Sequence, residues 1–400
     1  MKYLILLGDG MADYPLENGK TPLEMAHKPT IDALAQKSTV GLATTVPSHL
    51  PPGSDVANLS VMGYDPDLYY TGRSPLEAAS IGVPLKDSDI TFRCNLVCLS
   101  QDEPYEDKTM IDYSSDEIST EEAHELIKSI KPIFDTDEIT FYGGFSYRHL
   151  MVWNGAQMDF KLTPPHDISD RKITEYLPKG WHSNTILNMM KQSYDILKDH
   201  PVNQTRRERG LRPANSIWIW GEGTKPQLIS FYEKNNKRGS VISAVDLVKG
   251  IGILADMNVV EVEGATGNIH TNFEGKAKAA VDELQNGADF VYLHVEAPDE
   301  CGHRGEVGNK IKSIEYLDSR MLQHILPELD KMGEPYSILI MPDHPTPLSI
   351  KTHTHDAVPF MLYRSDAPCE GTAAYTEKHA AETGITVAKG HTLIEKLFEV

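Results

Sequence analysis

The sequence predicts an α/β protein with a mostly parallel sheet, helices on both faces of that sheet, and a smaller inserted α+β cap domain. Short apolar runs alternate with helical segments along the chain, which is the pattern of a parallel sheet covered by helices. The chain has 400 residues and so exceeds the size at which one hydrophobic core stops growing. The alternation breaks between residues 101 and 180, and we place the inserted domain there.

Six apolar runs are the candidate strands of the main sheet. One opens the chain and the others lie in its second half: Tyr3–Leu7, Ser216–Trp220, Val241–Ala244, Phe290–Val295, Tyr336–Met341 and Val358–Tyr363. In an open parallel sheet, ligands bind at the carboxyl ends of the strands. The polar residues that follow these runs are therefore the first places to look for a site.

Helix start signals support the segments between the strands. Thr21 and Glu24 have the spacing of a capping box around a proline at the first helical position. Ser119 and Glu122 repeat this spacing at the start of a segment that we expect to run to about Ile130.

A further helix is predicted from Lys310 to Leu326. Apolar residues recur there at spacings of three or four: Ile311, Ile314, Leu317, Met321 and Ile325. We expect these side chains to pack on the sheet as part of the core. We expect the helix to end at Pro327, because proline lacks the N–H that a helix interior needs.

The segment from 101 to 180 reads as an acidic loop, one helix and two short strands. The strands, Ile139–Tyr142 and His149–Trp153, flank Gly143-Gly144. We therefore expect a cap domain at 101–180 and a core domain formed by 1–100 together with 181–400.

Composition excludes several classes of partner. The formal net charge of −20 opposes binding to nucleic acid and to anionic membrane surfaces. No stretch approaches the roughly 18 consecutive apolar residues that span a bilayer. Four cysteines without Cys-x-x-Cys spacing do not make a disulfide framework. We expect a cytoplasmic protein with reduced thiols, and the sequence leaves its number of subunits open.

Residues of metal-ligand type follow the predicted strands. They are Asp9 after the first run, Asp299 and His303 after Phe290–Val295, Asp343 and His344 after Tyr336–Met341, and His353 and His355 before the last run. Singly, each has an ordinary alternative: Asp9 as a turn residue, or Asp299 as a helix cap. Together, carboxylates and imidazoles converging on one sheet edge would repel or lack partners unless a cation lay among them.

This donor set predicts phosphoryl transfer. Carboxylate and imidazole ligands suit Mn²⁺, Zn²⁺ or Mg²⁺, and there are enough of them for two ions. Two neighbouring ions stabilise both the attacking and the leaving oxygen of an in-line displacement.

Ser54 is the candidate nucleophile. It lies in Pro-Pro-Gly-Ser-Asp-Val-Ala-Asn, after a glycine and before a helix-like segment whose first N–H groups would face an anion. A metal ion beside the hydroxyl would lower its pKa and activate it. The alternative is that Ser54 is only a helix N-cap.

These residues resemble the archaeal-type cofactor-independent phosphoglycerate mutases of the alkaline phosphatase superfamily. The resemblance is carried along the whole chain by Leu-Gly-Asp9-Gly-Met, the segment around Ser54, Gly72-Arg73-Ser-Pro-Leu-Glu-Ala-Ala-Ser, Val295-Glu-Ala-Pro-Asp299-Glu-Cys-Gly-His303, Pro342-Asp343-His344 and Lys351-Thr-His353-Thr-His-Asp-Ala-Val-Pro-Phe. It implies an alkaline-phosphatase-like core, phosphoglycerate as the small-molecule substrate, and no need for bisphosphoglycerate.

The resemblance also implies roles for single residues. Ser54 would be transiently phosphorylated and would share one metal ion with Asp9, Asp343 and His344. Asp299, His303 and His353 would hold the second ion, and we leave His355 out of both sets. We expect Mn²⁺ first, with Zn²⁺ or Mg²⁺ as alternatives.

Substrate contacts are expected from cationic side chains, because guanidinium groups pair bidentately with phosphate and carboxylate. The candidates, which fall in segments similar to family motifs, are Arg73, Arg93, Arg148 and Arg206, with His166 and Asp167 as a cap-side acid or base. Each has the alternative of an interdomain salt bridge.

Three rival functions stay open at this point: a metal-dependent phosphomonoesterase, a mutase for another phosphorylated metabolite, and a metal-stabilised binding protein without turnover. The context of Ser54 lacks the pattern of sulfatases, which disfavours sulfate esters.

Overall fold

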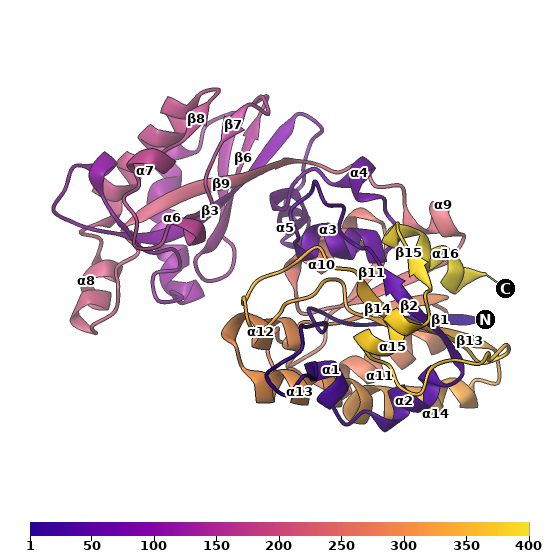
Figure 1. Cartoon of the computed structure of the whole chain (residues 1–400). Helices are drawn as coiled ribbons and strands as arrows, with labels where there is room; N and C mark the ends of the chain where they lie inside the picture. The colour runs from indigo at the N-terminus through magenta and orange to yellow at the C-terminus, as the bar shows by residue number, and fades with distance from the viewer. Residues whose placement is uncertain (400) are drawn as a thin grey trace. The chain divides into compact units, whose positions relative to one another are not determined.

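The computed structural model describes residues 1–399, which form two compact units (Figure 1). The core unit consists of Met1–Tyr70 and the chain from Gln227 onward, and the inserted unit is Thr71–Pro226. The cap expected at 101–180 lies inside the inserted unit, which begins earlier and ends later than that range. No helix within residues 1–399 has the length and apolar character needed to cross a bilayer.

The core unit contains an eight-stranded sheet in the order β11-β10-β12-β1-β13-β14-β2-β15. All strands run parallel to one another except β14, which is antiparallel to both of its neighbours. The strands are β1 (Lys2–Gly8), β2 (Ser38–Ala43), β10 (Gly239–Ile242), β11 (Asn258–Val260), β12 (Phe290–Val295), β13 (Tyr336–Met341), β14 (Val358–Arg364) and β15 (Thr386–Val387). The predicted α/β class with a mostly parallel sheet is confirmed.

Helices cover both faces of this sheet. One face packs against α1 (Pro22–Met25), α2 (Pro29–Ala35), α11 (Phe273–Gln285), α12 (Ala297–Arg304), α13 (Val307–Tyr316), the π-helical turn η4 (Leu317–Leu322), α14 (Gln323–Lys331) and α15 (Glu377–Glu382). The other face carries α3 (Ser54–Val61), α10 (Asp246–Leu254) and α16 (Leu393–Phe398), while α4 (Pro66–Tyr69), α9 (Phe231–Asn235) and η5 (Gly390–Thr392) are short connections.

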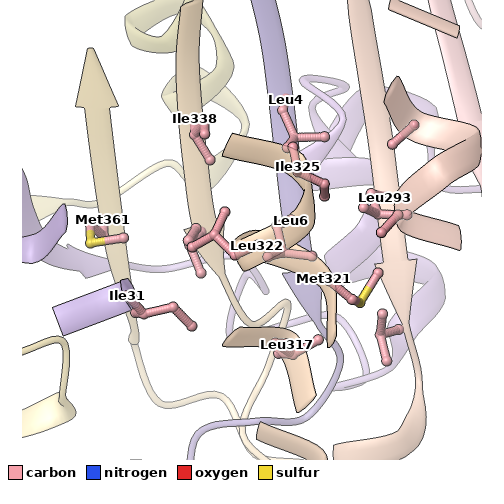
Figure 2. Close-up of a cluster of buried hydrophobic side chains, with 14 of the residues drawn as sticks. Leu4, Leu6, Ile31, Leu293, Leu317, Met321, Leu322, Ile325, Ile338 and Met361 are labelled. Carbon is pink, nitrogen blue, oxygen red and sulfur yellow. The ribbon is translucent and has the colours of Figure 1, made fainter. Parts of the chain in front are cut away.

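The core lies between the sheet and its first layer of helices. Figure 2 shows side chains of η4 and α14, among them Met321 and Ile325, beside Leu4 and Leu6 of β1. Side chains alternate between the two faces of a strand. In β12, Val291 and its second neighbours therefore enter this core, and the residues between them face the other layer.

Capping explains where two of the helices begin. Thr21 and Glu24 form the complete predicted capping box at α1. The Ser119 hydroxyl accepts a hydrogen bond from the Glu122 N–H at α6 (Thr120–Phe134), which runs four residues beyond the expected end. Both predicted helix starts are confirmed.

The predicted end of the helix at Pro327 is wrong, because α14 continues through it to Lys331. A proline removes one hydrogen bond and its ring presses on the carbonyl four residues earlier. That carbonyl belongs to Gln323, where the wider π-helical turn meets α14. The local change of helix type accommodates the ring.

The inserted unit is built on an antiparallel sheet in the order β4-β3-β6-β5, with β9 paired to β3. Its strands are β3 (Asp89–Leu99), β4 (Met110–Asp112), β5 (Ile139–Tyr142), β6 (Arg148–Asn154), β9 (Ser216–Thr224) and the separate pair β7 (Phe160–Lys161) and β8 (Lys179–Gly180). Its helices are α5 (Ser74–Ser80), α6, α7 (Ser183–Leu197), α8 (Pro201–Glu208), η1 (Tyr105–Asp107), η2 (Pro165–Ile168) and η3 (Thr174–Tyr176).

One strand prediction needs correction. The run Ser216–Trp220 is a strand, but it belongs to the inserted unit and not to the main sheet. A short apolar run has the same sequence pattern in either sheet, and its partner β3 lies far away in the sequence, so the pattern alone could not assign it.

Candidate metal centre

Three neighbouring strands end at one edge of the core sheet and bring the expected ligands together. β1 lies between β12 and β13. Asp9 follows β1, Asp299 and His303 lie on α12 just after β12, Asp343 and His344 follow β13, and His353 lies in the loop before β14. The shared direction of the strands explains why residues so distant in sequence meet here.

His344 is at the centre of a first group with Asp9, Asp343 and Ser54. Its Nε2 atom lies 3.5 Å from Asp9 Oδ1, 3.3 Å from Asp343 Oδ2 and 3.0 Å from Ser54 Oγ. Asp9, Asp343 and His344 are all buried. Two carboxylates and an imidazole that face one small space form the donor set of a divalent cation.

Asp299, His303 and His353 form a second group. His303 Nε2 is 3.2 Å from Asp299 Oδ2, His353 Nε2 is 3.3 Å from Asp299 Oδ1, and the two Nε2 atoms are 2.9 Å apart. The two Nδ1 atoms lie 3.0 Å and 2.9 Å from the carbonyl oxygens of Lys351 and Pro52. A ring nitrogen must carry a proton to bond to a carbonyl, so both Nδ1 atoms are protonated. In neutral rings the Nε2 atoms would then carry lone pairs directed toward Asp299. Metal-bound histidines have the same arrangement, with one nitrogen donating and the other free to bind the ion.

The pKa shifts show the charge imbalance of this region when the protein's own groups are its only charges. Burial, followed by the charges of Asp343 and Asp299, raises the pKa of Asp9 well above its usual value. Burial by itself lowers the pKa of His303, but its bond to Asp299 raises it to about 9. Both shifts favour the protonated group, because the site has an excess of negative charge. A metal ion would supply the missing positive charge.

One buried atom points to the same conclusion. Within residues 1–399, Asp9 Oδ1 is one of two buried side-chain polar atoms without a hydrogen-bond partner. Leaving such an atom unpaired costs about 1–3 kcal/mol, so native proteins rarely do so without a ligand, water or ion. The residues present therefore fit a divalent cation.

Ser54 is not the N-cap of its helix, and it lies beside the candidate metal centre. The N-cap of α3 is Gly53, and no side chain makes the capping bond. Ser54 is the first residue of the helix, and its hydroxyl faces His344. A hydroxyl at a helix N-terminus beside a cation site lies where backbone N–H groups attract an anion.

Several supporting residues were missed by the sequence reasoning. Asn58 donates from Nδ2 to Asp343 Oδ2 at 2.8 Å and to the Ser54 carbonyl at 2.9 Å. The Thr346 hydroxyl donates to Asp299 Oδ1. Asn58 follows Ser54 by one helical turn, so its spacing was a usable signal. Thr346 lies in a loop with no such signal.

Three of the four arginines expected to bind substrate gather around Glu77 in the inserted unit. Glu77 pairs with Arg73 Nε at 3.1 Å and with Arg93 Nε at 3.0 Å. Burial by itself raises the pKa of Glu77, but Arg93, Arg73 and Arg148 lower it below its usual value. Guanidinium groups pair bidentately with carboxylate and phosphate, so a group of three arginines suits a small anion.

His166 adjoins this arginine group. Its ring lies 5.2 Å from that of Trp220, and the Arg93 guanidinium lies 4.4 Å from the same Trp220 ring. Burial, together with the charges of Arg93 and Arg73, lowers the pKa of His166, although Asp167 opposes this. Both His166 and Asp167 are exposed.

Arg206 differs from the other expected arginines. Its side chain is buried and bonds to Glu122, to the Ser115 carbonyl and, at 3.0 Å, to the Arg212 carbonyl. These partners hold the end of α8 against the start of α6 and lie outside the group around Glu77. These bonds lie within the inserted unit, and a substrate contact by Arg206 stays a prediction.

Comparisons with known proteins agree with this geometry. A family model described as 2,3-bisphosphoglycerate-independent phosphoglycerate mutase matches residues 35–203. A protein of Geobacter sulfurreducens named "probable 2,3-bisphosphoglycerate-independent phosphoglycerate mutase" is 50% identical, with 100% of both chains covered. A 2,3-bisphosphoglycerate-independent phosphoglycerate mutase of Methanosarcina barkeri is 49% identical, with 98% of both chains covered.

Solved structures with the same fold extend this comparison. The PH0037 protein from Pyrococcus horikoshii is 29% identical and superposes with a TM-score of 0.81, with 99% of this chain and 96% of that chain covered. The cofactor-independent phosphoglycerate mutase from Thermoplasma acidophilum is 24% identical with a TM-score of 0.65, with 99% of both chains covered. The whole chain is therefore similar to these relatives.

Proposed function

The chain belongs to the 2,3-bisphosphoglycerate-independent phosphoglycerate mutase family, and we propose that it interconverts 3-phosphoglycerate and 2-phosphoglycerate through a phosphoserine at Ser54. The observation that carries this proposal is the Ser54 hydroxyl, which lies 3.0 Å from His344 at the N-terminus of α3. Family membership supports the substrates and the independence from bisphosphoglycerate.

Two divalent ions fit this proposal. Asp9, Ser54, Asp343 and His344 would hold one, and a second set, Asp299, His303 and His353, would hold the other. Such ions, when bound, lower the pKa of a nearby hydroxyl and neutralise the charge of phosphoryl oxygens. We expect Mn²⁺, with Zn²⁺ or Mg²⁺ as alternatives, because this mixed donor set suits all three.

Ser54 carries the phosphoryl group in two balanced steps. Its Oγ attacks phosphorus, the Oγ–P bond forms, and the bond from phosphorus to the 3-oxygen of the substrate breaks; the proton lost by Ser54 goes to that oxygen. The glycerate reorients, its 2-oxygen attacks phosphorus, and the Oγ–P bond breaks. The proton from the 2-hydroxyl then returns to Ser54.

Arginine side chains are the proposed partners of the substrate carboxylate. We propose that Arg73, Arg93 and Arg148 pair with the carboxylate of phosphoglycerate, since guanidinium groups match carboxylate geometry. His166, with Asp167 beside it at 3.7 Å, is suited to relay a proton to or from the glycerate hydroxyls.

Retention of glycerate separates a mutase from a phosphatase. The phosphoserine must transfer to the 2-hydroxyl before water reaches it, so we propose that water is excluded from the bound glycerate during the reorientation. The cytoplasmic location expected from the sequence is part of this proposal.

Phosphorus NMR tests the function. The metal-reconstituted protein is incubated with 3-phosphoglycerate, without bisphosphoglycerate, and 2-phosphoglycerate and free phosphate are followed in one series. We expect 2-phosphoglycerate to accumulate without free phosphate. Release of phosphate alone would show a phosphatase, and the absence of both products would refute the substrate assignment.

A further inference from the structure

Strand β12 presents two polar side chains on the sheet face that is opposite to the Leu4 and Leu293 core. Tyr292 and His294 are two residues apart, so both point to this face, and both are fully buried. Buried polar groups are costly unless they are bonded, and each of these two bonds toward the metal centre. Neither belongs to the proposed ligand sets.

His294 holds Asp9. Its Nε2 lies 2.9 Å from Asp9 Oδ2, and its Nδ1 lies 3.1 Å from Ser243 Oγ. When Asp9 is ionised, as a metal-bound carboxylate is, an unprotonated Nε2 would repel it, so Nε2 carries the proton and donates it. Ser243 already accepts the Val245 N–H and so can give its own hydrogen to Nδ1. The chain Ser243–His294–Asp9 thus fixes one oxygen of Asp9, while Asp9 Oδ1 faces His344.

Tyr292 holds Asp343 through Asn58. The Tyr292 hydroxyl lies 2.6 Å from Asn58 Oδ1, and Asn58 Nδ2 donates to Asp343 Oδ2 at 2.8 Å. The reverse orientation of the amide would turn its oxygen toward the carboxylate, so the tyrosine must be the donor. The same amide donates to the Ser54 carbonyl, which ties the nucleophile to Asp343.

We propose that Tyr292 and His294 are positioning residues that aim the carboxylates of Asp343 and Asp9 at the first cation and thereby set its affinity. The inference rests on the proposed metal centre. A carboxylate whose orientation is already fixed loses less freedom when it binds an ion, and loss of such an outer partner typically costs about 10–100-fold in metal affinity or activity.

Three variants test this role. His294→Leu removes the donor to Asp9, whereas His294→Gln offers an amide N–H near the position of Nε2. Tyr292→Phe removes only the hydroxyl that orients Asn58. The matched control is Tyr375→Phe: Tyr375 is also fully buried, and its hydroxyl donates to the Pro359 carbonyl at 2.7 Å, so its loss has a similar structural cost outside the centre.

The primary readout is the dissociation constant for Mn²⁺, measured from the electron paramagnetic resonance signal of the free ion, with kcat and KM as secondary readouts. We expect affinity to fall about 10–100-fold in His294→Leu and about tenfold in Tyr292→Phe. His294→Gln should stay close to the wild type, and Tyr375→Phe should match it.

Wild-type affinity in both His294→Leu and Tyr292→Phe would overturn the inference, as would an equal loss in Tyr375→Phe. If His294→Leu does not fold, Tyr292→Phe still decides the question. A wild-type protein that binds Mn²⁺ tightly but makes no 2-phosphoglycerate would refute the proposed function and leave the positioning role standing. A wild-type protein that binds no Mn²⁺ would overturn both.

Discussion

Each imidazole of the centre divides its two nitrogens between a structural bond and the site. His303 and His353 give Nδ1 to main-chain carbonyls and turn Nε2 toward Asp299. His294 accepts a hydrogen bond from Ser243 at Nδ1 and donates one from Nε2 to Asp9, so it supports a candidate ligand without facing the candidate cation site. The sequence position of a histidine does not show whether it is a candidate ligand or supports one. The hydrogen-bond partners of its two nitrogens do.

Ser54→Ala tests the nucleophile. We expect kcat to fall by at least about 10³-fold, because the phosphoryl group loses the oxygen that carries it. The melting temperature should change little, since Ser54 makes no capping bond. The control is Ser38→Ala, whose hydroxyl bonds only to the Leu34 carbonyl at 2.7 Å and which should keep wild-type kcat. Mutase activity that survives in Ser54→Ala would exclude this serine as the carrier.

Most of the candidate ligands were predictable from the sequence, but most of the residues that hydrogen-bond to them were not. Asp9 and Asp343 follow runs whose apolar character marks them as buried strands, and parallel strands carry such residues to one edge. His294 lies inside β12. There the sequence pattern does not distinguish a histidine that supports a candidate ligand from one that only packs in the core. Its role depends on Ser243 and Asp9, which lie far from it in the chain.

A buried ion pair connects the loops that carry the first group of candidate ligands. Lys310 on α13 donates to Asp13 Oδ2 at 2.8 Å and to the Thr346 carbonyl at 2.8 Å. Lys310 is fully buried and Asp13 nearly so. This pair joins the loop after β1 to the loop after β13, and these loops carry the ligands of the first group.

We expect Lys310→Met to lower the free energy of unfolding by about 3–5 kcal/mol, because it leaves a buried carboxylate without its partner. Lys28→Met is the matched control. Lys28 is equally buried and pairs with Asp32 at 2.9 Å, but the Asp32 side chain is 29% exposed and can turn to water. Urea unfolding should show a clearly smaller loss for Lys28→Met; equal losses would contradict the argument.

A buried histidine gives the inserted unit its own pH dependence. His149 on β6 accepts the Gly144 N–H at its Nδ1, and burial, with His124 nearby, lowers its pKa to about 3. An unfolded histidine has a pKa of about 6.5, so between these two values the unfolded chain binds the extra proton. The contribution of His149 is complete above the unfolded pKa and is lost as the pH falls toward the folded one.

His149→Asn tests this pH dependence, because the amide oxygen can accept the Gly144 N–H and does not titrate. Wild-type stability should fall by up to about 1.4 kcal/mol for each pH unit in this interval, and the variant should lack that component. Urea unfolding followed by tryptophan fluorescence measures it, because all four tryptophans lie in the inserted unit. Equal acid sensitivity in the two proteins would contradict the assignment.

At the scale of the molecule, the two units carry different groups of candidate site residues. All seven candidate metal-contacting residues lie in the core unit, and the arginine group lies in the inserted unit. The sequence predicted the α/β core because parallel strands and helices have local signatures. It could not assign β9 or extend the inserted unit to its observed ends, because antiparallel pairing with β3 depends on contacts between distant segments.

Metal removal should therefore act on one unit. A chelator should lower the melting temperature of the core unit and leave that of the inserted unit unchanged. Mn²⁺ at about 100 times its dissociation constant stabilises by about 2.7 kcal/mol, which corresponds to a rise of about 5–10 °C for a unit of this size. Calorimetry with and without the ion checks this prediction; equal shifts in both transitions, or none, would place the ion elsewhere.

The central claim is that the phosphoryl group passes through Ser54, and acid quenching followed by peptide mass spectrometry tests it most directly. The metal-loaded enzyme is mixed with 3-phosphoglycerate, quenched during turnover and digested. The account predicts a phosphorylated peptide that contains Ser54, that forms only with substrate and metal present, and that is absent from Ser54→Ala. Rapid turnover without this peptide, or with the phosphoryl group on another residue, would contradict it.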